Sequence, residues 1–420
     1  MPDSIHFIGA GGVGVSGLAH LALDLGHSVS ASDTASSRML ETLRARGVDC
    51  TVGHRTALPD GTGSVVYSAA VPENDPERLL ARAQGIPEFR RGAWLNMLAT
   101  RFGCRIAVSG SHGKTTTSAM LTHILRTAGR NPGFLIGGSV NGWERAAAAG
   151  DGTILVSEVD ESDGSQAGFP ASISLVLNID DDHSWALGGT EALEACFLSL
   201  CRPAQTVICW RSPVTERLFG GNGNAVFLDE PLPLPELAGW HNRVNAAMAV
   251  EAAVLCGVPR GAAREALRSF PGVSRRLSVR AQTGGRVLIE DYAHHPSELA
   301  ATLDALREKY PGKPLMVVFQ PHRNERVLRY GEAFGKLLSR VDWVGLTDAF
   351  GAWRTDGQFV DVRHAIGDHI AQGYSYLAGN NEACARRIWE EWARRPDAVL
   401  ALVGAGDITQ LVPCLQNFTD

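Results

Sequence analysis

The chain has 420 residues, of which 45% are hydrophobic and 20% are charged. This length exceeds what one hydrophobic core usually supports, so we expect about three domains, and the composition excludes a largely disordered or fibrous chain. The formal net charge is −6, from 39 Lys and Arg residues against 45 Asp and Glu residues. That balance argues against a generally cationic surface for nucleic acid or anionic lipid, so any polyanionic ligand must be bound by local groups.

The apolar segments and the cysteines of the sequence favour neither a membrane protein nor a protein that binds metal through thiolates. Residues 1–6 contain no basic segment, and no apolar run is long enough to span a bilayer. The eight cysteines are scattered without a CxxC pair, which is typical of reduced thiols rather than a zinc site or a disulfide frame. We therefore expect a cytoplasmic protein, a monomer or weak homodimer, with no nucleic-acid or membrane partner.

The first segment has the pattern of a β–α–β unit around a glycine-rich turn, Gly-Ala-Gly-Gly-Val-Gly at residues 9–14. The expected strand, helix and second strand are residues 5–8, 15–25 and 28–32. Glycines at such a turn let amide N–H groups and the helix dipole receive a diphosphate. The same turn can be purely structural, but the pattern favours a nucleotide.

Five residues of this segment are candidates for holding that nucleotide: Gly11, Gly12, Val13, Asp33 and Ser68. The first three belong to the turn. Asp33 ends the second strand and could accept hydrogen bonds from sugar or base groups. Ser68 ends a later strand, residues 65–68, near the same expected edge of the sheet.

A second unit has the order strand, phosphate loop, helix. The expected strand, residues 104–109, leads into a candidate ATP-binding loop: Gly110, Ser111, His112, Gly113, Lys114, Thr115 and Thr116. In such loops the backbone amides cradle phosphates, Lys114 would neutralise charge near the transferred phosphoryl group, and the Thr115 hydroxyl can coordinate Mg²⁺. Strict spacing would require a glycine at Val108, so this is a shortened variant. Its position between a strand and a helix argues against a chance match.

Two acidic runs follow expected strands in the same segment. The first run, residues 158–163, begins with Glu158, and the second, residues 178–183, ends with His183. Either run alone would suit a solvated loop. Two of them at strand ends beside a phosphate loop favour Mg²⁺ bound by carboxylate oxygens, with His183 as a candidate nitrogen ligand.

The third segment begins near residue 271, and three of its expected strands end in polar clusters: residues 286–289, 315–319 and 399–403. His294 and His295 follow the first of these strands and can equally be core residues. Arg323 and Arg326 lie just past the second, where binding of a carboxylate or phosphate is favoured over simple solvation.

Nine short motifs occur in a characteristic order: residues 9–14, 68–70 with 74–77, 110–117, 158–163, 178–183, 241–242 with Asn245, 291–296, 319–326 and 404–407. Together they resemble the Mur ligase family, the ATP-dependent amide-forming enzymes of peptidoglycan assembly. The resemblance implies an α/β fold of three domains. These would be a Rossmann-like UDP-sugar domain at 1–103, a shortened central P-loop ATPase-like domain binding ATP and Mg²⁺ at 104–270, and a Rossmann-like amino-acid domain at 271–420.

The resemblance also implies roles for single residues. Lys114, His183 and Arg276 would be catalytic, and Thr115, Glu158 and His183 would hold Mg²⁺, with two ions expected. Asn242 and Asn245 would hold the adenine, Arg276 would reach the ATP phosphates, and Asp291 would contact the nucleotide. His295, Arg323 and Arg326 would receive the amino acid, after which domain closure would exclude water from an acyl phosphate.

Within the family, the resemblance is closest to the branch that joins L-alanine to the lactyl carboxylate of UDP-N-acetylmuramate. Several other branches use a carbamylated lysine of the central domain, and no lysine occurs here between Lys114 and Lys309. Three departures concern the stretch between Trp210 and His241, which is shorter than usual, and the residues Ser184-Trp185 and Asn324-Glu325, which border expected substrate contacts.

Three alternatives remain open on the sequence. One is a Mur-type ligase with another amino acid or acceptor, in cell-wall recycling or specialised metabolism. A second is an NAD-dependent oxidoreductase, suggested by the turn at residues 9–14 and Asp33. A third is a non-catalytic nucleotide switch, which would form no amide.

Overall fold

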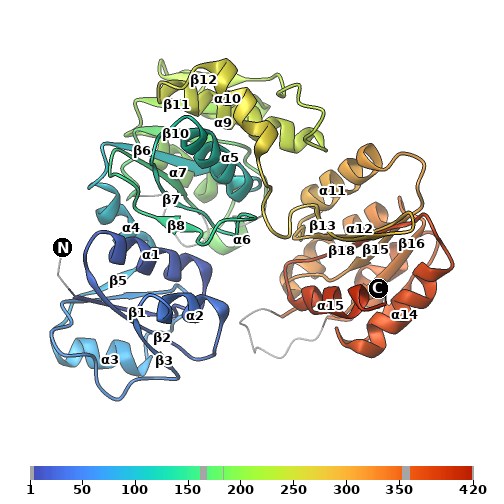
Figure 1. The fold of residues 1–420 in the computed structure, drawn as a ribbon, viewed down its shortest axis with the longest axis horizontal. Coiled ribbons are helices and arrows are strands. Elements are labelled where there is room, and N and C mark those ends of the chain that lie inside the picture. Colours follow the sequence, from blue (N-terminus) through green and yellow to red (C-terminus); the bar gives the residue numbers. More distant parts are fainter. Residues whose placement is uncertain (1–3, 161–167, 183, 352–359, 419–420) are drawn as a thin grey trace. The chain divides into compact units, whose positions relative to one another are not determined.

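The computed structural model describes residues 4–160, 168–182, 184–351 and 360–418. The strands form three sheets, which lie in successive stretches of the chain, so the expected α/β class is confirmed. By their internal contacts the residues divide into two compact units, Met1–Pro233 with Val244–Val273 and Leu234–Arg243 with Ser274–Asp420 (Figure 1). The first two sheets belong to the first unit, and the expected boundaries after residues 103 and 270 stay predictions.

The first sheet is parallel, with strand order β3-β2-β1-β4-β5. Its strands are β1 Ser4–Ile8, β2 Ser28–Asp33, β3 Asp49–Val52, β4 Ser64–Tyr67 and β5 Glu88–Arg90, and its helices are α1 Val13–Asp24, α2 Arg38–Arg44, α3 Pro76–Ala83 and α4 Arg91–Ala99. This order places β1 at the centre of the sheet. The chain adds β2 and β3 on one side of β1 and then crosses over to add β4 and β5 on the other side. The carboxyl end of β1, at such a switch point, is where open α/β sheets bind ligands.

The second sheet has the order β12-β11-β10-β6-β9-β7-β8 and is parallel except for the β7–β8 pair. Its strands are β6 Cys104–Ser109, β7 Gly133–Leu135, β8 Ala147–Ala148, β9 Ile154–Glu158, β10 Ile173–Val176, β11 Thr206–Trp210 and β12 Ala225–Leu228. The helices of this stretch are α5 Lys114–Thr127, α6 Ser184–Leu187, α7 Thr190–Cys201, α8 Pro213–Phe219, α9 Trp240–Leu255 and α10 Arg260–Ala266, followed by the short 3₁₀ helix η3 Leu267–Ser269. The central position of β6 puts the loop before α5 at the middle of the sheet.

One hydrophobic cluster joins the first two sheets. It contains Ile5 and Leu18 from the first sheet layer together with Leu135 and Leu155 from the second, all less than 4% exposed. A Cβ placed on Gly17 of α1 would lie 2.5 Å from Cδ1 of Leu135. The close packing of α1 on the second sheet explains why the two sheets form one unit.

The third sheet, β13-β14-β18-β15-β16-β17, is parallel except for the β13–β14 pair. Its strands are β13 Ser278–Thr283, β14 Arg286–Asp291, β15 Leu315–Phe319, β16 Trp343–Thr347, β17 Ser375–Leu377 and β18 Val399–Val403. Its helices are α11 Pro296–Lys309, α12 Asn324–Leu338, α13 Val362–Ala365, α14 Glu382–Ala393 and α15 Leu411–Gln416, with 3₁₀ helices η4 Gly367–His369 and η5 Asp407–Gln410.

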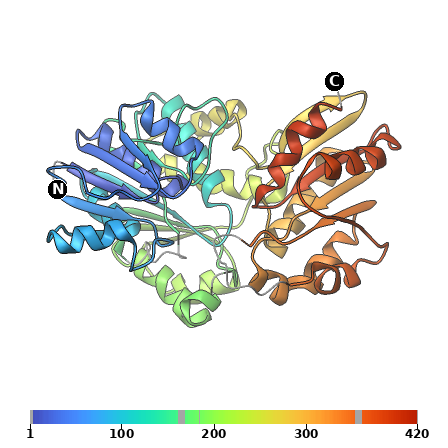
Figure 2. The ribbon, with the colours of Figure 1, turned by 90° about the horizontal axis from the view of Figure 1, so that it is seen from below.

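Both faces of the third sheet are covered by helices (Figure 2). Along β15, Val317 and Phe319 pack in the cluster that includes α11 and α12, whereas Met316 and Val318 pack with α14 and α15. Near-continuous apolar strands are typical of parallel sheets buried on both faces. Among the helices of the described residues, none is both long and apolar enough to cross a membrane.

Candidate active site

The loop between β6 and α5 has the backbone of a phosphate-binding loop. Gly110 and Gly113 have φ of +140° and +85°, a region that favours glycine. A Cβ on Gly110 would lie 2.9 Å from Cβ of Leu177, and one on Gly113 would lie 2.6 Å from Oδ1 of Asn245. Both glycines are therefore required by conformation and by close approach.

Residues after β10 hold this loop in place. The N–H of His112 donates to Oδ1 of Asn178 at 2.8 Å, and Nδ2 of Asn178 donates back to the His112 carbonyl at 3.0 Å. The N–H of Asp180 donates to Oγ of Ser111 at 2.8 Å. Sequence reasoning had assigned the run at residues 178–183 to metal binding and missed this contact, which no local pattern signals.

The first acidic run lies beside the start of α5. Lys114, which is 8% exposed, has Nζ 3.9 Å from Oδ1 of Asp160. The Thr115 hydroxyl donates to Oε2 of Glu158 at 3.0 Å, and the N–H of Gly137 donates to the same oxygen at 2.8 Å. The structure thus brings the predicted residues Lys114, Thr115 and Glu158 together and adds Asp160.

The surroundings of Glu158 suit a cation. Burial raises the pKa of the Glu158 carboxyl, and Asp160 raises it further, against the opposing effects of Lys114, the Gly137 N–H and the Thr115 hydroxyl. A partly buried carboxylate next to a second carboxylate and a hydroxyl is a set of hard oxygen donors of the kind that Mg²⁺ prefers. The residues present therefore fit Mg²⁺. His183, the third predicted ligand, lies outside the described residues.

The glycine turn of the first sheet brings its predicted residues to one edge. The N–H of Gly11 donates to Oδ2 of Asp33 at 2.8 Å. A Cβ on Gly9, whose φ is +77°, would lie 3.0 Å from Cβ of Ser68. Gly12 is the N-cap of α1, whose first residue is Val13. The structure assigns Asp33 a contact that shapes the turn, and its predicted contact with a nucleotide stays a prediction.

Glu77, in the motif at residues 74–77, contacts residues of the two strands that lead to this edge of the sheet. Glu77 is fully buried, and its carboxylate accepts the N–H of Arg55 at 2.7 Å and the hydroxyl of Ser32. Nε2 of His6 lies 3.6 Å from the same carboxylate. Burial by itself raises the pKa of Glu77, but these hydrogen-bond donors outweigh it and lower the pKa. The network joins β1, β2 and α3, so this motif has a structural role here.

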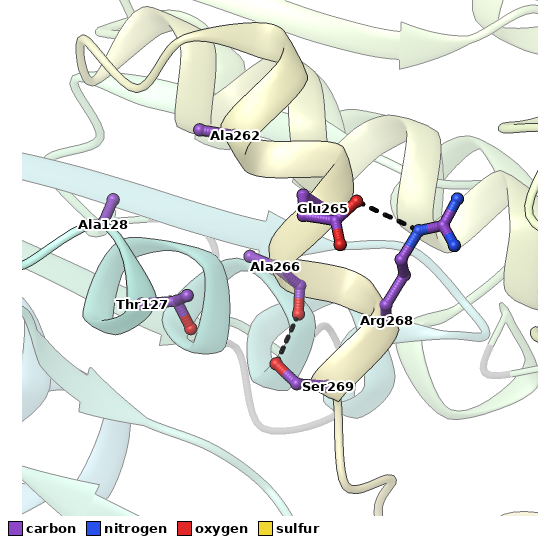
Figure 3. Close-up of a pocket in the computed structure, with 7 residues that line it drawn as sticks. All are labelled: Thr127, Ala128, Ala262, Glu265, Ala266, Arg268 and Ser269. Carbon is purple, nitrogen blue, oxygen red and sulfur yellow. Dashed lines mark hydrogen bonds and ion pairs between the residues drawn. The ribbon is translucent and has the colours of Figure 1, made fainter.

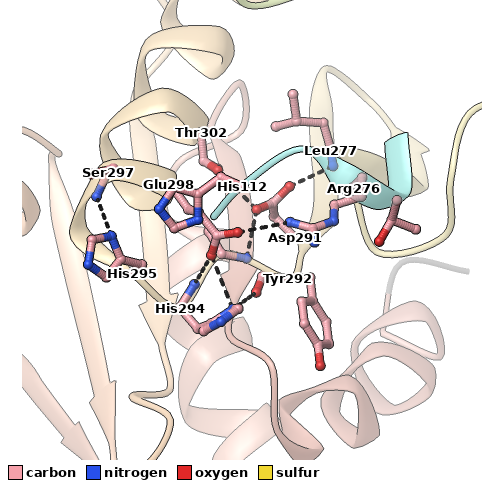
Figure 4. A network of polar contacts seen from close by, with 12 residues as sticks. His112, Arg276, Leu277, Asp291, Tyr292, His294, His295, Ser297, Glu298 and Thr302 are labelled. Carbon is pink, nitrogen blue, oxygen red and sulfur yellow. Dashed lines mark hydrogen bonds and ion pairs between the residues drawn. The ribbon is translucent and has the colours of Figure 1, made fainter. Parts of the chain in front are cut away.

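In the C-terminal unit, the carboxylate of Asp291 at the end of β14 accepts hydrogen bonds from three neighbouring residues (Figure 4). Its carboxylate accepts the N–H of Leu277 at 2.7 Å, the N–H of Ala293 at 3.0 Å and the hydroxyl of Thr302 at 2.9 Å. Burial raises the pKa of Asp291, and Arg276 and these donors oppose the rise. The predicted contact of Asp291 with a nucleotide stays a prediction.

Arg276 lies between an acid and an aromatic ring. Nη1 of Arg276 is 3.5 Å from Oε1 of Glu298, and its guanidinium carbon is 5.2 Å from the centre of the Tyr292 ring. Its neighbours Arg275 and Leu277 have φ of +60° and +46°. Such conformations in residues other than glycine cluster at functional sites, which agrees with the predicted importance of Arg276.

The predicted amino-acid residues lie at the carboxyl ends of β14 and β15. His295 is the N-cap of α11, and its ring centre lies 4.9 Å from that of Tyr330. Arg326 is 2% exposed, with Nη1 3.3 Å from Nδ1 of His322. His322 in turn stacks on Phe350, with ring centres 5.7 Å apart. A buried guanidinium is suited to binding a carboxylate.

Arg323 is, after Arg275 and Leu277, the third residue other than glycine with positive φ among the described residues of the C-terminal unit, at +68°. Its N–H donates to the Phe350 carbonyl at 2.9 Å. Sequence reasoning selected Arg323 and Arg326 but missed His322, Tyr330 and Phe350. Tyr330 follows Arg326 by one helical turn, a spacing that could have indicated it. Phe350 is distant from Arg323 in the sequence, and no local sequence pattern indicates that the two residues are in contact.

The two predicted adenine residues lie on α9, three residues apart and so on one face of the helix. Asn245 is 6% exposed and packs against Gly113. Nδ2 of Asn242 donates to the Ala238 carbonyl at 2.8 Å. Their role in binding adenine stays a prediction.

A pocket of about 500 Å³ lies away from the phosphate loop (Figure 3). It is lined by Thr127, Ala128, Ala262, Glu265, Ala266, Arg268 and Ser269, and the ion pair of Glu265 with Arg268 spans 3.1 Å. Thr127 ends α5, whereas the phosphate loop precedes its first residue, and a helix of 14 residues is about 21 Å long. This pocket is therefore separate from the candidate active site.

Comparison with known proteins connects these features to a family. Residues 4–103 match the family model described as "Mur ligase family, catalytic domain", and residues 275–406 match "Mur ligase, glutamate ligase domain". A UDP-N-acetylmuramate--L-alanine ligase of Bradyrhizobium sp. (strain ORS 278) is 33% identical, covering 98% of this chain and 97% of its own. The ligase of the same name from Anaeromyxobacter sp. (strain Fw109-5) is 34% identical with the same coverages.

Solved structures agree in fold. The UDP-N-acetylmuramate-alanine ligase of Thermotoga maritima superposes with a TM-score of 0.83 at 24% identity, covering 99% of this chain and 98% of its own. A murein peptide ligase of Psychrobacter arcticus superposes with a TM-score of 0.70 at 21% identity, covering 99% of each chain. The Bradyrhizobium alignment spans 458 positions, more than the 420 residues of this chain, so the alignment contains gaps in this chain. The expected shortening of the central domain stays a prediction.

The sequence identity over nearly the whole chain and the two matched models argue against one of the alternatives left by the sequence, the NAD-dependent oxidoreductase. An oxidoreductase would leave both matches unexplained, as well as the Lys114–Asp160 pair beside the phosphate loop. The chain belongs to the Mur ligase family of ATP-dependent ligases.

Proposed function

We propose that this protein joins L-alanine to the lactyl carboxylate of UDP-N-acetylmuramate, with conversion of ATP to ADP and phosphate. The observation that carries the proposal is the cluster of Lys114, Thr115, Glu158 and Asp160 next to the loop of Gly110 and Gly113. It combines a cation, hard oxygen donors and a glycine loop that leads into the N-terminus of a helix, groups that phosphoryl transfer to a carboxylate requires. The names of the relatives at 33–34% identity support the choice of substrates.

The reaction proposed here proceeds in two steps. A carboxylate oxygen of the acceptor attacks the γ-phosphorus of ATP, the bond to ADP breaks, and an acyl phosphate forms. The amine of L-alanine then attacks the acyl carbon, phosphate leaves, and the nitrogen loses a proton. Activation is needed because joining a carboxylate and an amine in water is unfavourable.

The residues of the central sheet would serve the first step. The loop amides and Lys114 would hold the ATP phosphates and offset their repulsion from the incoming carboxylate. Thr115 and Glu158, with His183, would hold Mg²⁺, which when bound neutralises charge on the phosphate oxygens. The buried position of Lys114, 8% exposed, strengthens its effect because little water screens it.

The C-terminal unit would bind the amino acid. Arg326 would pair with the L-alanine carboxylate, with Arg323 and His295 beside it. The guanidinium forms two parallel hydrogen bonds to a carboxylate, which fixes the direction of the amine. We further propose that the protein acts in the cytoplasm, where ATP and the nucleotide sugar are present.

Release of ADP with UDP-N-acetylmuramate, measured across a panel of amino acids, tests the function. We expect L-alanine to give the highest kcat/KM. If release depends on another amino acid, the alternative of a Mur-type ligase with a different substrate holds. An absence of any L-alanine-dependent release would overturn the proposal, and ATP binding without any amide product would identify a nucleotide switch.

A further inference from the structure

Arg91, the first residue of α4, lies against the glycine turn of the first sheet. A Cβ on Gly14 would lie 2.7 Å from Nη1 of Arg91 and 3.1 Å from its Cδ. Gly14 is in the first turn of α1. The missing side chain at this position is thus what leaves room for the guanidinium beside the end of the helix that faces the expected nucleotide sugar.

The same end of α1 points toward the acids of the second sheet. The C-terminal residue Asp24 accepts the N–H of Ala149 at 3.0 Å, and Gly17 in the middle of the helix packs on Leu135, the last residue of β7. The first turn of α1 therefore lies beyond the carboxyl end of β7. Gly137, two residues past Leu135, donates its N–H to Glu158, so the acid lies on that side too.

Charge interactions agree with this placement. Burial lowers the pKa of the Arg91 guanidinium, and the negative charges of Asp160 and Glu158 oppose that change. Both acids are thus within electrostatic reach of Arg91. The guanidinium therefore lies against the glycine turn and is influenced by the two acids of the Lys114 cluster.

A carboxylate that must reach the γ-phosphate of ATP meets strong repulsion there. It approaches two protein carboxylates and the phosphates, while Lys114 is already 3.9 Å from Asp160. A second cation on the side of the nucleotide sugar would offset this repulsion and orient the carboxylate. A guanidinium is suited to both tasks, because it stays charged and forms two parallel hydrogen bonds to a carboxylate.

We propose that Arg91 binds the lactyl carboxylate of the acceptor and holds it between the glycine turn and the Lys114 cluster. The inference rests on the proposed function, because it assumes an acceptor with a carboxylate. In this arrangement the diphosphate of the nucleotide sugar would be bound by the glycine turn and the N-terminus of α1, whose helix dipole favours a negative charge. Arg91 is then the residue that distinguishes an acceptor with a carboxylate from one without.

Two ligands separate this role from others. UDP-N-acetylmuramate carries the lactyl ether with its carboxylate, whereas UDP-N-acetylglucosamine has the same nucleotide and amino sugar with a free hydroxyl in place of that ether. For Arg91→Gln, measured by calorimetry in the full chain, we expect the affinity for the first ligand to fall about 10- to 100-fold and that for the second to change less than about twofold. Arg91→Lys should recover part of the loss, and Arg90→Gln, at the exposed neighbouring position, is the matched control.

The remaining outcomes overturn the inference. Equal losses for both ligands would assign Arg91 to the diphosphate or to the fold, and no loss would remove it from the site. If Arg91→Gln does not fold, Arg91→Lys decides by the same comparison, because a shortened cation should still weaken only the carboxylate ligand. Failure of the proposed function is visible separately, as an absence of L-alanine-dependent ADP release by the unaltered protein, whatever the affinities of the two ligands.

Discussion

The N–H of Leu277 donates a hydrogen bond of 2.7 Å to the buried carboxylate of Asp291. Leu277 and Arg275 both have positive φ, and Arg276 lies between them. Such conformations cost about 1–3 kcal/mol each and persist only where the surrounding structure holds them. The hydrogen bond from Leu277 to Asp291 helps to stabilise this backbone conformation. The position of Arg276 therefore depends on a carboxylate at the end of β14.

Replacing Asp291 by Ala should lower the free energy of unfolding of the C-terminal unit. Two N–H groups and the Thr302 hydroxyl would lose a buried acceptor, a loss of about 2–4 kcal/mol. Urea unfolding followed by tryptophan fluorescence measures the change. Asp368→Ala, at a position 64% exposed, is the control, and a loss below about 1 kcal/mol for Asp291→Ala would contradict the anchoring role.

Lys114→Ala should abolish ADP formation, with a fall in kcat/KM of more than about 1000-fold, because the γ-phosphate loses its buried cation. Binding of UDP-N-acetylmuramate should change less than about twofold, because no phosphate of that ligand is expected at Lys114. Calorimetry and a coupled ADP assay give the two values. Lys336→Ala, at a position 70% exposed, should alter neither, and retained turnover in Lys114→Ala would refute the role.

Thr115→Ala should raise the Mg²⁺ concentration for half-maximal activity by about 10- to 100-fold. The hydroxyl now 3.0 Å from Glu158 would be missing from the oxygen donors. Thr115→Ser should remain close to the unaltered protein because it keeps the hydroxyl. Thr127→Ala, on the exposed end of the same helix, is the control, and an unchanged Mg²⁺ titration in Thr115→Ala would exclude Thr115 as a ligand.

Arg326→Lys should raise the KM for L-alanine by about 10- to 100-fold while the KM for ATP changes less than about twofold. Lysine keeps the charge but cannot form two parallel hydrogen bonds to the amino-acid carboxylate. Steady-state kinetics with each substrate varied in turn provides the test. Arg329→Lys, at an exposed position of α12, should leave both values unchanged, and a larger effect on ATP than on L-alanine would argue for a phosphate site instead.

His241 should make the stability of the protein depend on pH. Burial lowers the pKa of His241 to about 4, with added lowering from Arg276 and Arg243 and opposition from Glu298 and Glu308. Since the unfolded chain binds the proton more tightly, the contribution of neutral His241 is fully present above the ordinary histidine pKa of about 6.5 and is lost as the pH falls toward 4.

For His241→Gln we expect a flatter pH dependence of the free energy of unfolding over this window, by about 2–3 kcal/mol. Urea unfolding at several pH values between about 4 and 7 measures the difference. His364→Gln, at a position 78% exposed, should follow the unaltered protein. Identical curves for His241→Gln and the unaltered protein would show that His241 does not titrate in this way.

Much of the site was predictable from local patterns. The loop at residues 110–117 and the turn at residues 9–14 lie where the sequence placed them, between a strand and a helix, because glycine spacing and hydrophobic periodicity are properties of a few consecutive residues. Glu158, Asp291 and Ser68 were expected at the ends of strands for the same reason, since the strands are continuous apolar runs.

Contacts between distant residues were decided only by the tertiary structure. Asn178 and Asp180 hold the phosphate loop, Glu77 supports the first sheet, and Arg91 lies against Gly14. The sequence by itself determined the fold class, the family resemblance and the residues that can carry the chemistry. Only the tertiary structure decided which groups each of these residues contacts. The pKa of a carboxylate and the partner of a guanidinium depend on neighbours that folding brings within a few ångströms.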